Sequence, residues 1–180
     1  LVYDCYDLME EKHYSYCILN LAQAYEVFFS HYLRVELLYK PFSLKDDPDL
    51  HQLNSVSNLL YKTIKNYTFA PLRSIFINWV LLGRTVATLD ESESLLGELN
   101  DLITEPPDKK IADLEDKPLS DLLLSLKKTK IVELSSQVAH KRAYRPKLEE
   151  VEAPLKETRS ILFPLASHLK VQTEDINLYS

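Results

Sequence analysis

The residues best suited to chemistry lie in the segment 131–146, where an apolar helical pattern ends in a histidine and a group of basic residues. The histidine is His140, and imidazole titrates near neutral pH, so it can both remove and deliver a proton. It is followed directly by Lys141 and Arg142, with Arg145 further on. Histidines near helix ends also act as caps for the last carbonyl groups. His140 is therefore a candidate acid or base, with a capping role as the alternative.

Positive charge is concentrated in residues 127–147, which we call the basic segment. It contains seven basic residues and one acidic residue, a net charge of +6 in a chain whose net charge is −6. The basic residues are Lys127, Lys128, Lys130, Lys141, Arg142, Arg145 and Lys147. Such a patch favours a polyanion, because Coulomb attraction and counterion release both favour phosphate there. The alternative is a solvated helix end whose cations complement the helix dipole.

An aromatic side chain lies within the basic segment. Tyr144 stands between Arg142 and Arg145, where its ring is placed to stack on a nucleic-acid base. The alternative is that the ring packs against the protein. We therefore expect contacts to RNA or phosphate from Tyr144, the two arginines and Lys141.

The composition excludes several classes of protein. With 180 residues, 46% of them hydrophobic, the chain is long enough for one domain with its own core. Its two glycines are too few for the Gly-rich loops of P-loop and dinucleotide-binding folds. No apolar run is long enough to cross a membrane, and the two cysteines form no disulfide framework. We therefore expect a single domain over residues 1–180, in a reducing, cytoplasmic setting and without membrane contact.

Side chains that could bind a metal are few. His13 and Cys17 are four residues apart, so they share one helix face, and Cys5 is the nearest additional thiol. A closed zinc site needs four ligands, and the sequence offers no second pair. We therefore expect neither a metal nor another cofactor.

The elements that position these residues are expected to be helices. Apolar residues recur at helical spacing, and no segment shows the alternation of a half-buried strand. Helices are expected over residues 14–38, 50–60, 71–89, 90–99, 119–140 and 148–169. The segment 71–89 is apolar almost all round, so it is expected to be a buried central helix with Trp79 in the core. The pattern is typical of an all-α helical bundle of about five or six helices.

Prolines and capping residues predict where these helices begin and end. Pro41 is expected to end the first long helix, and the segment 46–48 to start the second. Asp90 and Glu93 have the spacing of a capping box.

The second half of the chain contains further breaks. The charged, proline-framed segment 104–118 is expected to form a long loop. Pro146 is expected to break the chain after the segment that contains His140. Pro154 and Pro164 predict a kink or an interruption in the last helix.

The sequences ELSSQVAHKRAYRP, residues 133–146, and NLAQAYEVFF, residues 20–29, are two stretches that resemble HEPN domains. The first of them resembles the end of the third long helix of that family. The family signature there is an arginine, often followed by asparagine, then three further residues before a histidine. The sequence NLAQAYEVFF, residues 20–29, resembles the earlier HEPN helix, in which a polar or acidic residue faces the signature. The order of the long helices agrees as well.

The resemblance implies metal-independent cleavage of RNA by a homodimer, in which the histidine acts as acid or base and the arginine braces the phosphate. His140 then takes the histidine position, and Glu26 takes the supporting polar position. Ser135 stands at the arginine position and Ser136 at the asparagine position, and serine brings no positive charge to a phosphate. Loss of such a clamp costs on the order of several kcal/mol in the transition state. An arginine of the basic segment could replace it by folding back.

The spacing of the two motif residues adds a geometric condition. Ser135 and His140 are five residues apart, so on a regular helix they point about 140° away from each other. They would share a site only if the helix is distorted or a second chain completes it.

From these patterns we expect a HEPN-like domain that associates with RNA or a nucleotide. If it is an enzyme, we expect a metal-independent endoribonuclease of the toxin–antitoxin or defence type. The alternative is a catalytically inactive dimerisation or protein-interaction module, whose basic segment docks an acidic partner protein or antitoxin. Function resides in the site, so the fold alone does not separate these two readings.

Overall fold

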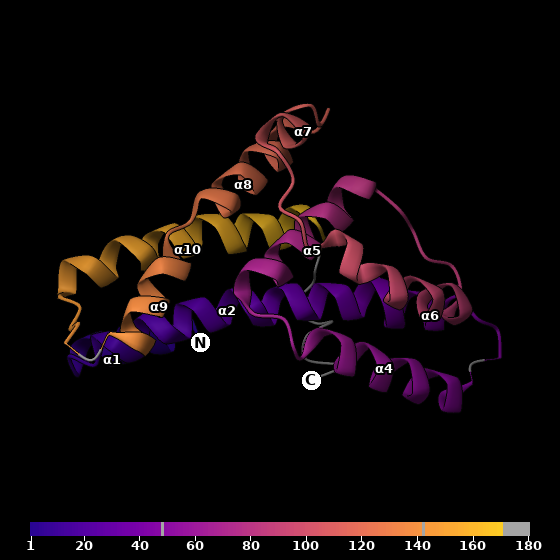
Figure 1. Cartoon of the computed structure of the whole chain (residues 1–180), viewed down its shortest axis with the longest axis horizontal. Coiled ribbons are helices and arrows are strands. Elements are labelled where there is room, and N and C mark those ends of the chain that lie inside the picture. The colour runs from indigo at the N-terminus through magenta and orange to yellow at the C-terminus, as the bar shows by residue number, and fades with distance from the viewer. Residues whose placement is uncertain (48, 142, 171–180) are drawn as a thin grey trace. The chain divides into compact units, whose positions relative to one another are not determined.

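The computed structural model of the chain describes residues 1–47, 49–141 and 143–170. All regular secondary structure in these residues is helical, and no strand occurs among them (Figure 1). The predicted all-α class is therefore confirmed. The chain divides into two compact units: unit 1 comprises residues 1–28 and 111–180, and unit 2 comprises residues 29–110. The single domain expected over residues 1–180 stays a prediction.

The helices of unit 1 bury apolar side chains that recur at helical spacing. They are α1 (Asp4–Glu10), the first part of α2 (Tyr14–Arg34), α8 (Lys117–Lys128), α9 (Ile131–His140) and α10 (Leu148–His168). The buried side chains include Ile18, Leu21, Tyr25, Leu123, Leu126, Val151, Leu155 and Leu165. The helices α8 and α10 pack against each other (Figure 1). The short helix α7 (Asp108–Ala112) lies at the division between the units.

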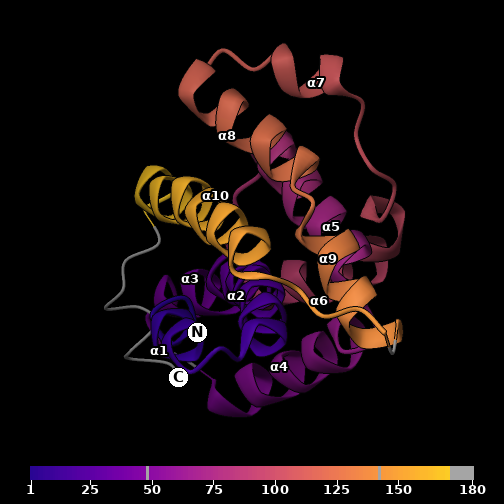
Figure 2. The same cartoon turned by 90° about the vertical axis from the view of Figure 1, so that its left-hand side faces the viewer.

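Unit 2 is organised around a buried helix, which the sequence predicts over residues 71–89 but which ends at Leu82. This is α5 (Phe69–Leu82), in which every residue from Leu72 to Trp79 is buried. The other elements are α3 (Lys40–Ser43), α4 (Leu50–Ile64), α6 (Leu89–Glu98), the π turn η1 (Val35–Tyr39) and the 3₁₀ turn η2 (Leu99–Leu102). The helices α4 and α6 lie side by side (Figure 2). Gly83 ends α5 in the left-handed conformation, with φ of 57°.

The first long helix does not end at Pro41, so that prediction was wrong. After α2 the chain continues through η1 into α3, and Pro41 is buried near the start of α3. At the end of η1 the backbone N–H of Lys40 donates to the carbonyl of Val35, five residues earlier. Because a π turn is wider than an α turn, it gives the proline ring room next to the preceding carbonyl groups.

The start of α6 is capped by a different pair of residues from the one predicted. The hydroxyl of Thr88 accepts a hydrogen bond from the backbone N–H of Glu91 at 3.2 Å. The Glu91 carboxylate in turn accepts from the backbone N–H of Ala87 at 2.8 Å. Asp90 instead accepts from the Gln52 side chain at 2.6 Å, which joins α6 to α4. The predicted box of Asp90 and Glu93 was therefore wrong.

The helix predicted over residues 119–140 is divided into α8 and α9 at Thr129. The Thr129 hydroxyl donates to the Glu157 carboxylate of α10 at 2.8 Å and accepts from the backbone N–H of Ile131 at 3.4 Å. Thr129 itself is extended, with ψ of 136°. This tertiary hydrogen bond competes with a continuous helix, and residues 127–140 alone give no sign of it.

Two further segments differ from expectation in detail. Of the two alternatives predicted for Pro154 and Pro164, the interruption is wrong, because α10 runs through both prolines, and the kink stays a prediction. The segment 104–118 is not a loop throughout, since it contains α7 and the first residues of α8. The break predicted at Pro146 is confirmed, because α9 ends at His140 and α10 begins at Leu148.

Candidate functional site

His140 is the last residue of α9, and its side chain is exposed. The next backbone N–H, that of Lys141, donates to the carbonyl of Gln137 at 2.9 Å. Within residues 1–47, 49–141 and 143–170, no hydrogen bond or ion pair involves the His140 imidazole. The imidazole therefore does not cap α9, and it is accessible to an external group.

Ser135 is a half-buried residue of the same helix. Its hydroxyl donates to the carbonyl of Val132 at 3.0 Å, so it is already engaged by the α9 backbone. Because α9 is regular from Ile131 to His140, Ser135 points about 140° away from His140. The two positions of the HEPN-like motif therefore do not share one face of this chain.

Glu26 lies in α2 and is half-buried. Burial raises the pKa of its carboxyl, because a charged carboxylate is poorly solvated there. In the described part of the chain it makes no hydrogen bond or ion pair, and none joins it to His140. A carboxyl with a raised pKa is a better proton donor near neutral pH, but its geometry in one chain does not couple it to the histidine.

The connection from α9 to α10 carries the other predicted residues. Lys141 and Arg145 are exposed, and the Arg145 guanidinium donates to the carbonyl of Tyr144 at 2.9 Å. The Tyr144 hydroxyl donates to the Glu150 carboxylate at 3.1 Å. Burial and the nearby Glu150 raise the pKa of Tyr144. Arg142 lies outside the described residues.

Glu150 is the residue of this region whose role the sequence did not predict. Besides Tyr144, its carboxylate accepts from the backbone N–H of Lys147 at 2.8 Å, where α10 begins. The spacing of three residues between the N-cap and a glutamate is the signal that could have identified it. Glu150 thus orders the connection after His140.

The basic segment presents unpaired cations at both ends of α9. Four exposed lysines have no hydrogen bond or ion pair from the side-chain nitrogen within the described ranges: Lys128, Lys130, Lys141 and Lys147. A helix of the length of α9 spans about 15 Å, so the two groups of charge are separated by about that distance.

A groove between α1 and α10 is a second feature of unit 1, and the sequence did not predict it. It has a volume of about 490 Å³ and is lined by Tyr6, Met9, Glu152, Leu155, Lys156, Arg159, Ser160 and Phe163. The Arg159 guanidinium donates to the Tyr6 hydroxyl and lies 5.9 Å from the centre of that ring. Beside the groove, Tyr3 and Phe163 stack with ring centres 6.2 Å apart. These two aromatic side chains remain 69% and 43% exposed.

The described residues were also considered as a metal site and as membrane-spanning helices. Among the residues with a described position, no group of three or more His, Cys, Asp or Glu side chains could hold a metal ion. In the same residues, no helix combines the length and the apolar character needed to span a membrane.

Comparisons with family models, with curated proteins and with solved structures found no match to this chain. The resemblance to HEPN domains therefore rests on residues 20–29 and 133–146 and on the order of the long helices.

Proposed function

We propose that the chain is a HEPN-like domain that binds RNA through the basic segment. The observation that carries this proposal is the set of four exposed, unpaired lysines at the two ends of α9. Cations that already pair with carboxylates would have to break those pairs to bind phosphate, whereas unpaired ones need only release solvent and counterions. The HEPN-like homodimer is part of the proposal, because a second chain is one way to bring further groups to His140.

The salt dependence of RNA binding tests this proposal. In the test variant the four lysines become glutamine: Lys128→Gln, Lys130→Gln, Lys141→Gln and Lys147→Gln. The control removes the same charge from exposed lysines elsewhere: Lys45→Gln, Lys62→Gln, Lys109→Gln and Lys110→Gln. If each of the four lysines contacts one phosphate of single-stranded RNA, the slope of log K against log salt falls by about 3 in the test variant. The control should keep the wild-type slope. Equal slopes in the two variants would exclude the basic segment as the binding site.

Cleavage is the second part of the proposal. With Ser135 in place of the arginine and Glu26 not coupled to His140, we expect RNA binding without turnover by one isolated chain. The test incubates a mixed RNA pool with the wild type and with His140→Ala, in the absence of metal. Cutting that disappears in the variant would show a working nuclease whose phosphate clamp comes from another position. No cutting by folded wild-type protein would support a binding function.

A second candidate function, a protein-interaction module, is favoured by the groove between α1 and α10. Exposed tyrosine and arginine side chains are types that dominate binding energy in protein interfaces, and phenylalanine is enriched there. Lys156 and Arg159 outnumber the one carboxylate, Glu152, in the groove lining. The partner that fits is therefore an amphipathic segment with apolar side chains flanked by carboxylates.

A displayed library of random helical peptides tests this second candidate. Selection on the wild type should enrich peptides that combine apolar residues with Asp or Glu. Their binding should weaken at least tenfold on Lys156→Glu and on Phe163→Ser, two exposed positions. If the selected peptides bind both variants as well as the wild type, the groove is not the docking site.

A further inference from the structure

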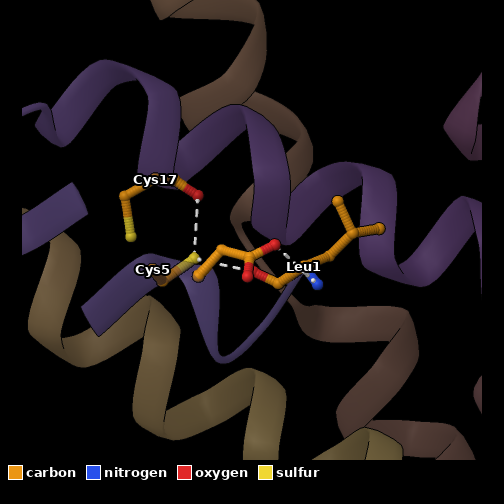
Figure 3. Close-up of polar contacts among 4 residues, drawn as sticks. Leu1, Cys5 and Cys17 are labelled. Atoms are coloured by element: carbon orange, nitrogen blue, oxygen red, sulfur yellow. Dashed lines mark hydrogen bonds and ion pairs between the residues drawn. The ribbon is translucent and has the colours of Figure 1, made fainter. Parts of the chain in front are cut away.

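The two cysteines of the chain meet where α1 and α2 adjoin. Cys5 lies in α1 and Cys17 in α2, and both are free and completely buried. The thiol of Cys5 donates to the backbone carbonyl of Cys17 at 3.5 Å and to that of Leu1 at 3.4 Å. Figure 3 shows the Cys17 side chain directed from α2 toward α1, on the side where Cys5 lies. The two side chains are therefore neighbours across the two helices, which a disulfide between them requires.

The two thiols also differ in acidity. A hydrogen bond between the two side chains lowers the pKa of the Cys5 thiol, while the same hydrogen bond and burial raise the pKa of the Cys17 thiol. Cys5 is therefore the more acidic thiol of the pair. The thiolate is the reactive form of cysteine, so we take Cys5 as the thiol that reacts first.

We propose that Cys5 and Cys17 are an oxidation site, which a small disulfide such as oxidised glutathione converts into an intramolecular disulfide. In the first step, the Cys5 thiolate attacks one sulfur of the small disulfide. A mixed disulfide forms on Cys5 and one small thiolate leaves. In the second step, Cys17 loses its proton and attacks the Cys5 sulfur, which expels the second small thiolate. Two protein thiols are oxidised, one small disulfide is reduced, and the released thiolates take up the two protons.

Access to the buried pair comes through opening of α1. Cys5 is the one buried residue of this helix, which has seven residues. So short a helix is not stable by itself, and few buried contacts hold it, so local opening precedes global unfolding. A Cys5–Cys17 disulfide would then fasten α1 to α2. Because α1 also forms one side of the groove with α10, the disulfide would restrict opening of that side of the groove.

The experiment treats the native protein with oxidised glutathione, blocks remaining thiols with N-ethylmaleimide and measures intact and tryptic masses. Lys12 lies between the cysteines, so cleavage there places them on separate peptides, and the chain has no other cysteine. We expect these two peptides to be linked, with no alkylated thiol. The melting temperature should rise by several degrees, because the cross-link restricts the unfolded chain.

Two single variants separate the roles of the thiols. Cys17→Ser should stop at the mixed disulfide on Cys5, because the resolving thiol is missing. Cys5→Ser leaves Cys17 as the one cysteine of the chain, so it should give at most a mixed disulfide on Cys17 and no internal link. Any one of three results overturns the proposal: two glutathione adducts without a link, a link between two chains, or no reaction of native protein when urea-unfolded protein reacts. This inference does not depend on RNA binding.

Discussion

Asp116 illustrates how one carboxylate can join two distant parts of unit 1. One oxygen accepts from the backbone N–H of Leu119 at 3.1 Å and so caps α8. The other lies 2.6 Å from the His168 imidazole at the end of α10. The hydrogen bond to His168, followed by that to the Leu119 N–H, lowers the pKa of Asp116. Both contacts stabilise the ionised carboxylate in the folded protein.

Asp116→Asn should therefore lower stability in a pH-dependent way. A folded-state pKa below the unfolded value of about 3.9 means that the stabilisation is present above that pH and is lost as the pH falls through the folded pKa. Asparagine keeps a capping oxygen but removes the charge. At pH 5 we expect the urea midpoint of Asp116→Asn to lie slightly below that of the wild type. This difference should become smaller toward pH 3. Asp113→Asn removes an exposed carboxylate nearby and should show no such pattern. If the urea midpoint were lowered equally at pH 5 and at pH 3, the ionised Asp116 carboxylate would not be the cause of the loss.

At the scale of elements, the start of α4 shows how a helix end is selected. The sequence predicts a start for α4 at residues 46–48, but the cap is Asp49. Its carboxylate accepts from the backbone N–H groups of His51 at 2.9 Å and Gln52 at 3.2 Å. Several neighbouring residues have suitable side chains, and only the backbone geometry selects one of them. Pro48 lies outside the described residues.

Asp49→Ala should destabilise the protein by about 1 kcal/mol, because two backbone donors at the start of α4 lose their acceptor. Asp49→Asn should cost only a few tenths of that, since asparagine caps nearly as well. Asp47→Ala, at the start predicted from sequence, should leave the free energy of unfolding unchanged. Urea denaturation of the three variants measures these differences. A larger loss for Asp47→Ala than for Asp49→Ala would contradict the assigned cap.

The two adjacent leucines of α4 make a matched pair for the effect of burial. Both side chains are leucine, but Leu60 is 1% exposed and Leu59 is 39% exposed. Successive helical residues point about 100° apart, so both cannot face the core equally. Leu60→Ala should cost about 2–5 kcal/mol through lost burial and a cavity, and Leu59→Ala less than about 1 kcal/mol. Thermal and urea unfolding compare the two. Similar costs would show that the face of α4 is wrongly assigned.

At the scale of the whole molecule, two buried tyrosines should make the free energy of unfolding depend on pH in the alkaline range. Burial raises the pKa of Tyr25 to about 12 and also raises the pKa of Tyr32, which Glu36 raises further. Both side chains belong to α2, Tyr25 in unit 1 and Tyr32 in unit 2. The phenolate is disfavoured in the fold, so these groups resist ionisation until the protein unfolds.

Stability should therefore fall as the pH rises from about 10 toward 12. A folded-state pKa above the unfolded value of about 10 means that the stabilisation is complete below pH 10 and is lost as the pH rises through the folded pKa. Tyr25→Phe should reduce the slope of the free energy of unfolding against pH in this range. The reduction corresponds to a difference of up to one bound proton per molecule between the folded and unfolded states. Tyr61→Phe, at an exposed tyrosine, is the control and should not change it. Urea midpoints at pH 9, 10 and 11 provide the measurement, and identical slopes for wild type and Tyr25→Phe would refute the assignment.

Local patterning was sufficient for the all-α class, for the burial of the helix around Trp79 and for the break at Pro146. Each of these depends on the period of apolar residues or on a proline, which are properties of a short stretch of chain. The candidate residues His140, Lys141 and Tyr144 were likewise identified from one continuous segment.

Contacts between distant residues supplied the rest. The break at Thr129 depends on Glu157, and the placement of Asp116 depends on His168. The approach of Cys5 to Cys17 and the groove between α1 and α10 also arise only when helices pack. The cause is physical: local sequence sets which face of a helix is apolar, but which polar groups meet across helices depends on how those faces pack together.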